Sequence, residues 1–159
     1  MITRGLLIDL AAPPRNILAP GEVITPQEIQ AALDRKSLNV RPGDIVLLRT
    51  GWAQYYATHN PIYVGDAPGL GIAGAEFLAA QGAVVIGSDT MGLEVSPPED
   101  PSRPWAVHQV LLANHGVYIL ENANLDTIAN DGLTEFMCIC LADKIQGATA
   151  SLVRLVAVI

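Results

Sequence analysis

The sequence predicts an α/β fold, because short apolar strands alternate along it with helical segments. Residues 45–48 and 83–87 are almost wholly apolar, which is typical of strands buried on both faces of a parallel sheet. Polar residues follow these strands directly, and ligands of α/β sheets bind beside the carboxyl ends of strands. We therefore expect a single domain over residues 1–159, with a functional site at that edge of the sheet.

The first half of the chain opens with an expected strand over residues 6–10, followed by a proline-rich connection. Thr25, Pro26 and Glu28 predict the start of a helix, with Thr25 as the N-cap and Glu28 as its capping-box partner. After the strand at residues 45–48, the segment AGAEFLAAQ predicts a helix that ends at a glycine.

In the second half, the expected elements follow the strand at residues 83–87 and a loop rich in proline and acidic residues. They are a helix over residues 105–115, a strand at 117–120, a helical turn at 125–130, and strands at 134–145 and 152–159. Gly116 is expected to end the helix. We find no internal repeat and no linker long enough to divide the chain.

The composition excludes several classes of protein. A net charge of −7 repels phosphate backbones, so we expect no nucleic-acid partner. No apolar run approaches the roughly 20 residues that span a bilayer, and the amino terminus lacks the apolar core of a signal peptide. With 50% hydrophobic residues and a mean hydropathy of +0.34, some apolar surface is expected in a homo-oligomer interface.

For that interface, we expect either the opening strand, with apolar surface and a free edge exposed, or the apolar tract at residues 137–141 to lie near the contact. The tract includes Cys138 and Cys140, the only two cysteines. They form no disulfide framework, which predicts a cytoplasmic protein. Two residues apart in a strand, they share one face and are expected to be core side chains.

Four stretches, RGLLIDL, RPGDIVLLRTGW, VVIGSDTMGLE and VHQVLLANHGVYILEN, occur in this order. In this respect the chain resembles the cyclase family, which includes bacterial kynurenine formamidase and isatin hydrolase. The resemblance implies a swivelling β/β/α fold and assembly as a homo-oligomer. It also implies a divalent metal, Zn or Mn, that serves hydrolysis of an amide, formamide or cyclic imide bond in a small-molecule substrate.

The chain departs from this family at its metal motif, His-x-Gly-Thr-His-x-Asp-x-Pro. Its only histidines are His59, His108 and His115, and none lies in such a motif. The chain therefore looks like the carboxyl-terminal part of a family member, and we expect it to be inactive by itself. Two possibilities stay open: half of a hydrolase whose other ligands come from a partner region, or a remnant that keeps the fold and the oligomer interface.

The resemblance carries over two metal ligands, His108 and Glu121, and it also makes His108 the candidate catalytic residue. Neutral imidazole and carboxylate are good ligands for Zn²⁺ and Mn²⁺. Two ligands alone rarely hold such a metal tightly, because catalytic zinc sites usually use three. The alternative is that His108 is an ordinary helix residue and Glu121 a solvated strand end.

Asp89, Thr90 and Trp52 are the candidate substrate-binding residues, since all three follow expected strands. Asp89 could instead cap backbone N–H groups of a turn, and Trp52 could be a core side chain with its N–H satisfied. His115, directly before Gly116, is expected to interact with the carboxyl terminus of its helix.

Overall fold

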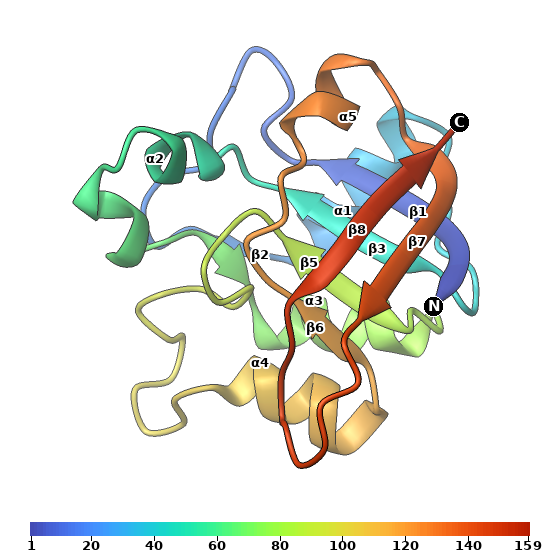
Figure 1. Cartoon of the computed structure of the whole chain (residues 1–159). Coiled ribbons are helices and arrows are strands. Elements are labelled where there is room, and N and C mark those ends of the chain that lie inside the picture. Colours follow the sequence, from blue (N-terminus) through green and yellow to red (C-terminus); the bar gives the residue numbers. More distant parts are fainter.

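The structure, a computed structural model, describes residues 1–159 and is built around a six-stranded mixed sheet (Figure 1). The strands lie in the order β6-β5-β3-β1-β7-β8, and β2 and β4 form a separate small sheet. The strand bounds are β1 Ile2–Asp9, β2 Val23–Ile24, β3 Ile45–Arg49, β4 Gly69–Leu70, β5 Val85–Ser88, β6 Tyr118–Leu120, β7 Glu135–Ala142 and β8 Val153–Val158.

The sheet has a parallel half and an antiparallel half that meet at β1. Strands β1, β3, β5 and β6 run parallel, with Leu7 opposite Leu47 and Gly87 opposite Leu120. Strand β7 is antiparallel to β1, and β8 is antiparallel to β7. The expectation that the first strand presents a free edge is wrong, because β7 pairs with it from the far end of the sequence.

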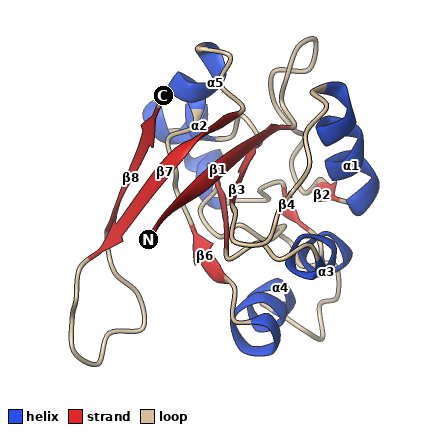
Figure 2. Cartoon of the chain, turned by 90° about the vertical axis from the view of Figure 1, so that its right-hand side faces the viewer, coloured by secondary structure: helices blue, strands red, loops and turns tan.

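Helices cover both faces of the sheet (Figure 2). Side chains of α1, α3 and the π-helix pack with β1, β3 and β5 in the larger apolar core, and α5 lies over the opposite face. The helix bounds are α1 Pro26–Arg35, α2 Ala53–Ala57, α3 Ile72–Ala80, α4 Ala106–His108 and α5 Asp126–Asn130, with a 3-10 turn at Pro61–Val64 and the π-helix at Gln109–His115.

Most expected elements are present, with two informative differences. The capping box at the start of α1 is confirmed, because the Thr25 hydroxyl accepts from the Glu28 N–H while the Glu28 carboxylate accepts from the Thr25 N–H. The expected helix at residues 105–115 is instead a single α-turn that continues as a π-helix. The small β2-β4 sheet was not expected, since two-residue strands leave no periodic signal.

The cysteines lie where their spacing predicts, on the sheet face that packs against the smaller apolar core. Cys138 is fully buried there and Cys140 is partly buried, and both are free thiols. None of the helices has both the length and the apolar character needed to cross a membrane.

Candidate metal and active site

His108 lies between two carboxylates at the carboxyl edge of the parallel strands. Its Nδ1 is 3.0 Å from Oε2 of Glu94, and its Nε2 is 3.3 Å from Oε1 of Glu121. His108 ends α4, and the π-helix begins at the next residue. Departures from α-helical geometry of this kind are frequent at functional sites. The structure thus brings together the two residues that the resemblance implies as metal ligands.

Both carboxylates favour the charged imidazolium. The hydrogen bond with Glu121, followed by that with Glu94, raises the pKa of His108 to about 9, against the opposing effect of burial. In the metal-free protein at neutral pH, both ring N–H groups therefore donate, one to each carboxylate. A metal at Nε2 would have to replace the proton on that nitrogen.

Glu94 is the functional residue that sequence reasoning missed. It stands 14 residues before His108, in a loop, and no spacing rule connects the two. Its side chain is buried, and one oxygen, Oε2, also accepts from the His108 backbone N–H at 3.1 Å. The only sequence signal is that this acidic residue begins the proline- and acid-rich loop that leads into the helix of His108.

Glu121 follows the last residue of β6, and its side chain is 39% exposed. The next residue, Asn122, is held from both sides. Its backbone N–H donates to the carbonyl of Thr90 at 2.9 Å, and its side-chain oxygen accepts from the Tyr63 hydroxyl. Burial, with Asp89 nearby, raises the pKa of Tyr63 to about 12, so this hydroxyl stays a donor.

Asp89 adopts the capping geometry that was the alternative to substrate contact. It is 1% exposed, and it accepts from the Thr50 N–H at 2.9 Å, the Thr50 hydroxyl at 2.6 Å and the Gly51 N–H at 2.9 Å. Burial raises its pKa, and these hydrogen bonds oppose the rise. Thr90 is equally buried, with its hydroxyl 2.6 Å from that of Ser88.

Trp52 is a fully buried core side chain, whose indole N–H donates to the carbonyl of Tyr63 at 3.2 Å. Trp52 lines neither of the two cavities near the site, but it packs against Tyr63 and Ala67, which line the larger one. His115 lies at the end of the π-helix, where its Nε2 is 2.7 Å from Oε2 of Glu76 on α3. It therefore bridges two helices, beyond the expected role at its own helix end.

A cavity of about 170 Å³ borders Glu94 and Trp105, both neighbours of His108, although His108 and Glu121 do not line it. Trp105, Met91, Tyr63 and Glu94 contribute to its walls. The ring of Trp105 meets that of His108 edge-on, with centroids 5.2 Å apart. The backbone of Trp105 is left-handed, with φ 63°, which is a strained conformation for a bulky residue. Strained conformations of this kind cluster at functional sites.

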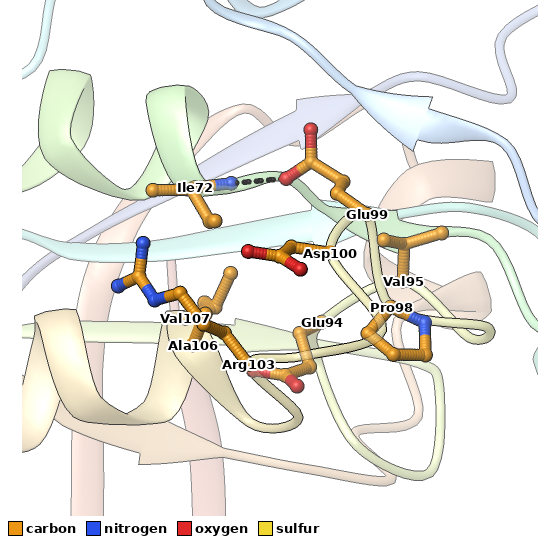
Figure 3. A pocket seen from close by; sticks show the side chains of 9 residues that line it. All are labelled: Ile72, Glu94, Val95, Pro98, Glu99, Asp100, Arg103, Ala106 and Val107. Carbon is orange, nitrogen blue, oxygen red and sulfur yellow. Dashed lines mark hydrogen bonds between the residues drawn. The ribbon is translucent and has the colours of Figure 1, made fainter.

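Glu94 also borders a smaller pocket of about 10 Å³, large enough for one water molecule (Figure 3). Two other carboxylates lie there. Glu99 accepts from the Ile72 N–H at 2.6 Å and so caps α3, and Asp100 accepts from the hydroxyl of Ser102. These carboxylates serve local structure.

The donor set fits a metal only in part. Imidazole Nε2 and a neighbouring carboxylate are suitable ligands, and the second carboxylate on Nδ1 is the usual partner of a metal-bound histidine. However, no group of three His, Cys, Asp or Glu side chains in the chain is placed to hold an ion together. Glu94 is occupied on the far side of the ring and does not complete the set.

The Cyclase family model matches residues 1–95, more than half of the chain. A solved structure described as a novel cyclase is 28% identical, with a TM-score of 0.86 over 99% of this chain and 54% of its own. An isatin hydrolase bound to the product analogue thioisatinate is 23% identical, with a TM-score of 0.79 over 98% of this chain and 60% of its own. Isatin hydrolase A from Ralstonia solanacearum is 20% identical, with a TM-score of 0.80 over 97% of this chain and 59% of its own.

The chain therefore belongs to the cyclase family, and its mixed α/β fold is that of the family, as the sequence predicted. It spans little more than half the length of these solved structures. Among curated proteins, no significant match was found. Two other neighbours with this fold, 20% and 21% identical, are described as a potential metal-dependent hydrolase with cyclase activity and a predicted metal-dependent hydrolase.

Proposed function

We propose that the chain is one part of a metal-dependent hydrolase that cleaves the C–N bond of an amide, a formamide or a cyclic imide. The observation that carries the proposal is the convergence of His108 Nε2 and Glu121 Oε1, 3.3 Å apart, while Glu94, the other hydrogen-bond partner of His108, lies in the wall of a cavity. Likeness to isatin hydrolases adds support for an amide bond within a ring, because isatin is a cyclic amide.

His108 and Glu121 would hold the metal, either Zn²⁺ or Mn²⁺. When bound, such an ion activates a water molecule and polarises the scissile carbonyl. A further ligand is needed, because catalytic sites of this kind commonly use three. It would come from residues outside these 159 or from a second copy of the chain.

The other residues would shape the binding site. Trp105 and Met91 offer an apolar wall to the substrate, and the cavity of about 170 Å³ suits one aromatic ring, since a 150 Å³ apolar cavity accepts benzene. Three of the candidate residues are buried, namely Asp89, Thr90 and Trp52. They would not contact the substrate but would hold in place the strand ends that carry the site. We therefore propose that Trp105, and not Trp52, contacts the substrate.

Metal titration of the purified chain tests the ligand assignment. We expect weak binding of Zn²⁺ or Mn²⁺, well under one retained equivalent, because only two ligands converge. His108→Ala and Glu121→Gln should each weaken that binding at least tenfold by calorimetry. His115→Ala is the matched control, since His115 also pairs with a carboxylate but lies elsewhere. Equal affinity in all four proteins would contradict the assignment.

Hydrolysis of isatin and of aryl formamides tests the reaction. The chain by itself, with added metal, should be indistinguishable from buffer, because the ligand set is incomplete. A remnant that keeps only the fold would also show no activity. The metal titration distinguishes such a remnant from an incomplete hydrolase. A remnant binds metal no better than His108→Ala does. Metal-dependent turnover that disappears in His108→Ala would show instead that the chain completes a site.

We also propose that the chain forms a homo-oligomer through the outer face of β7 and β8. Residues directly opposite each other share a face, so Ile2, Ile139 and Val156 form one row, and Met137 and Val158 the next. Four of these five side chains are classed as exposed, and β8 is an edge strand. Exposed apolar faces beside a free edge favour pairing with a second copy.

Light scattering at micromolar concentration tests this assembly. The wild type should be at least a dimer, and Val156→Lys should shift the protein toward the monomer. A monomeric wild type would overturn the proposal.

A further inference from the structure

We propose that Glu94 is the positioning residue of the site: it holds Nδ1–H of His108, so that Nε2 is the ring nitrogen turned toward Glu121. As far as it concerns a metal, this inference rests on the proposed function. The orientation of the ring does not depend on it. Glu94 does not touch the metal in this arrangement. It also forms part of the cavity wall, but both hydrogen bonds of its carboxylate go to His108.

One carboxylate oxygen makes both contacts to His108. Oε2 of Glu94 accepts from the backbone N–H at 3.1 Å and lies 3.0 Å from Nδ1. The backbone N–H belongs to the first turn of its helix, where no carbonyl of the same helix is available as a partner. The oxygen therefore fixes the start of the helix and the rotation of the ring together. Because the backbone N–H can only donate, an acceptor must occupy this position.

Glu94 is itself held rigidly. It is 8% exposed, and its backbone pairs with Leu70 in an isolated parallel bridge. That pairing brings Gly69 so close that an added Cβ would lie 2.4 Å from the carbonyl carbon of Glu94. The preceding residue, Leu93, is left-handed at φ 58° and fully buried. The carboxylate is thus aimed by backbone constraints, unlike a mobile surface side chain.

This arrangement selects one tautomer of the neutral ring. Glu94 and Glu121 compete for the single proton of the neutral ring. Glu94 is closer, at 3.0 Å against 3.3 Å, and buried, whereas Glu121 is 39% exposed and water can solvate its carboxylate, so the proton stays on Nδ1 and the lone pair on Nε2. Only the lone pair of Nε2 can bind an ion shared with Glu121. Loss of such an outer carboxylate typically weakens metal affinity by about 10- to 100-fold.

Nitrogen NMR of ¹⁵N-histidine-labelled protein without metal tests the tautomer directly. Spectra are recorded near pH 10.5, above the ring pKa of about 9, and His108→Asn identifies the signal. We expect the Nδ1–H tautomer in the wild type and a shift toward the Nε2–H form in Glu94→Ala. A wild-type ring in the Nε2–H form would overturn the proposal without any variant, as would an unchanged tautomer in folded Glu94→Ala.

Two further variants separate positioning from general damage. Glu94→Gln keeps an oxygen acceptor, so it should fold and retain the Nδ1–H tautomer even if Glu94→Ala does not fold; an Nε2–H ring there would contradict the proposal. Glu99→Gln makes the same charge change in the same loop, away from His108, and should leave the ring signals unchanged. Zn²⁺ affinity is measured separately. Failure of the proposed function alone would remove Zn²⁺ binding and leave the tautomer result intact.

Discussion

Asp89 and Glu121 are both carboxylates that directly follow neighbouring parallel strands, β5 and β6, yet the structure uses them in opposite ways. Asp89 is 1% exposed and accepts three hydrogen bonds from Thr50 and Gly51. Glu121 is 39% exposed, and its one side-chain partner is His108. That a carboxylate follows a strand tells us only that it lies at this edge of the sheet. The number of hydrogen-bond donors around it decides whether it stabilises the fold, as Asp89 does, or is available to a ligand, as Glu121 is.

The largest expected effect on stability comes from removing Asp89, the carboxylate that accepts three hydrogen bonds. Asp89→Ala leaves the N–H groups of Thr50 and Gly51 buried without an acceptor, which should lower the free energy of unfolding by about 3 kcal/mol or more. Urea denaturation measures this loss. Glu121→Ala is the natural comparison, and a loss as large there would abolish the distinction between the two carboxylates.

A smaller effect is expected from pH. The folded-state pKa of His108, about 9, lies above the value near 6.5 of an unfolded histidine. The resulting stabilisation is complete below about pH 6.5 and is lost as the pH rises through about 9. We expect a loss of about 1–2 kcal/mol, reduced by solvent screening at the exposed Glu121. Urea denaturation at several pH values should show this decline in the wild type and little of it in His108→Asn.

The smallest effect on stability is expected for Glu121→Gln. Its carboxylate is partly exposed, and such ion pairs contribute under about 1 kcal/mol. The same substitution should reduce metal binding at least tenfold, so stability and binding would separate. Asp126→Asn, which affects an equally exposed ion pair with Arg49, is the control for stability. A decrease well above 1 kcal/mol in Glu121→Gln alone would make Glu121 a structural residue.

Local features of the fold were predictable from the sequence, and distant pairings were not. Thr25, Pro26 and Glu28 are within one helical turn of each other, so their capping box is visible in the sequence. The placement of β7 beside β1 joins residues such as Thr3 and Cys138, and no spacing rule reaches so far. For that reason the first strand was wrongly expected to present a free edge.

The residues of the candidate site also fall into those that could be predicted from the sequence and one that could not. His108 and Glu121 could be named from the motifs that contain them, and the structure places their side chains together. Glu94 could not be named, because its aim depends on the close approach of Gly69 and the left-handed Leu93. These are properties of folded backbone that leave no periodic signal in the sequence.

The position of β1 between β3 and β7 also has a consequence for synthesis on the ribosome. Strand β3 emerges soon after β1, but β7 is the second-to-last strand to be synthesised. Glu135 of β7 pairs with the Arg4 side chain of β1. Until then, one side of the central strand has no hydrogen-bonding partner. Closing so long a loop adds little entropy cost, since that cost grows only with the logarithm of length. A nascent chain stalled before residue 135 would therefore expose an apolar strand edge to other chains, and premature termination there should yield aggregates.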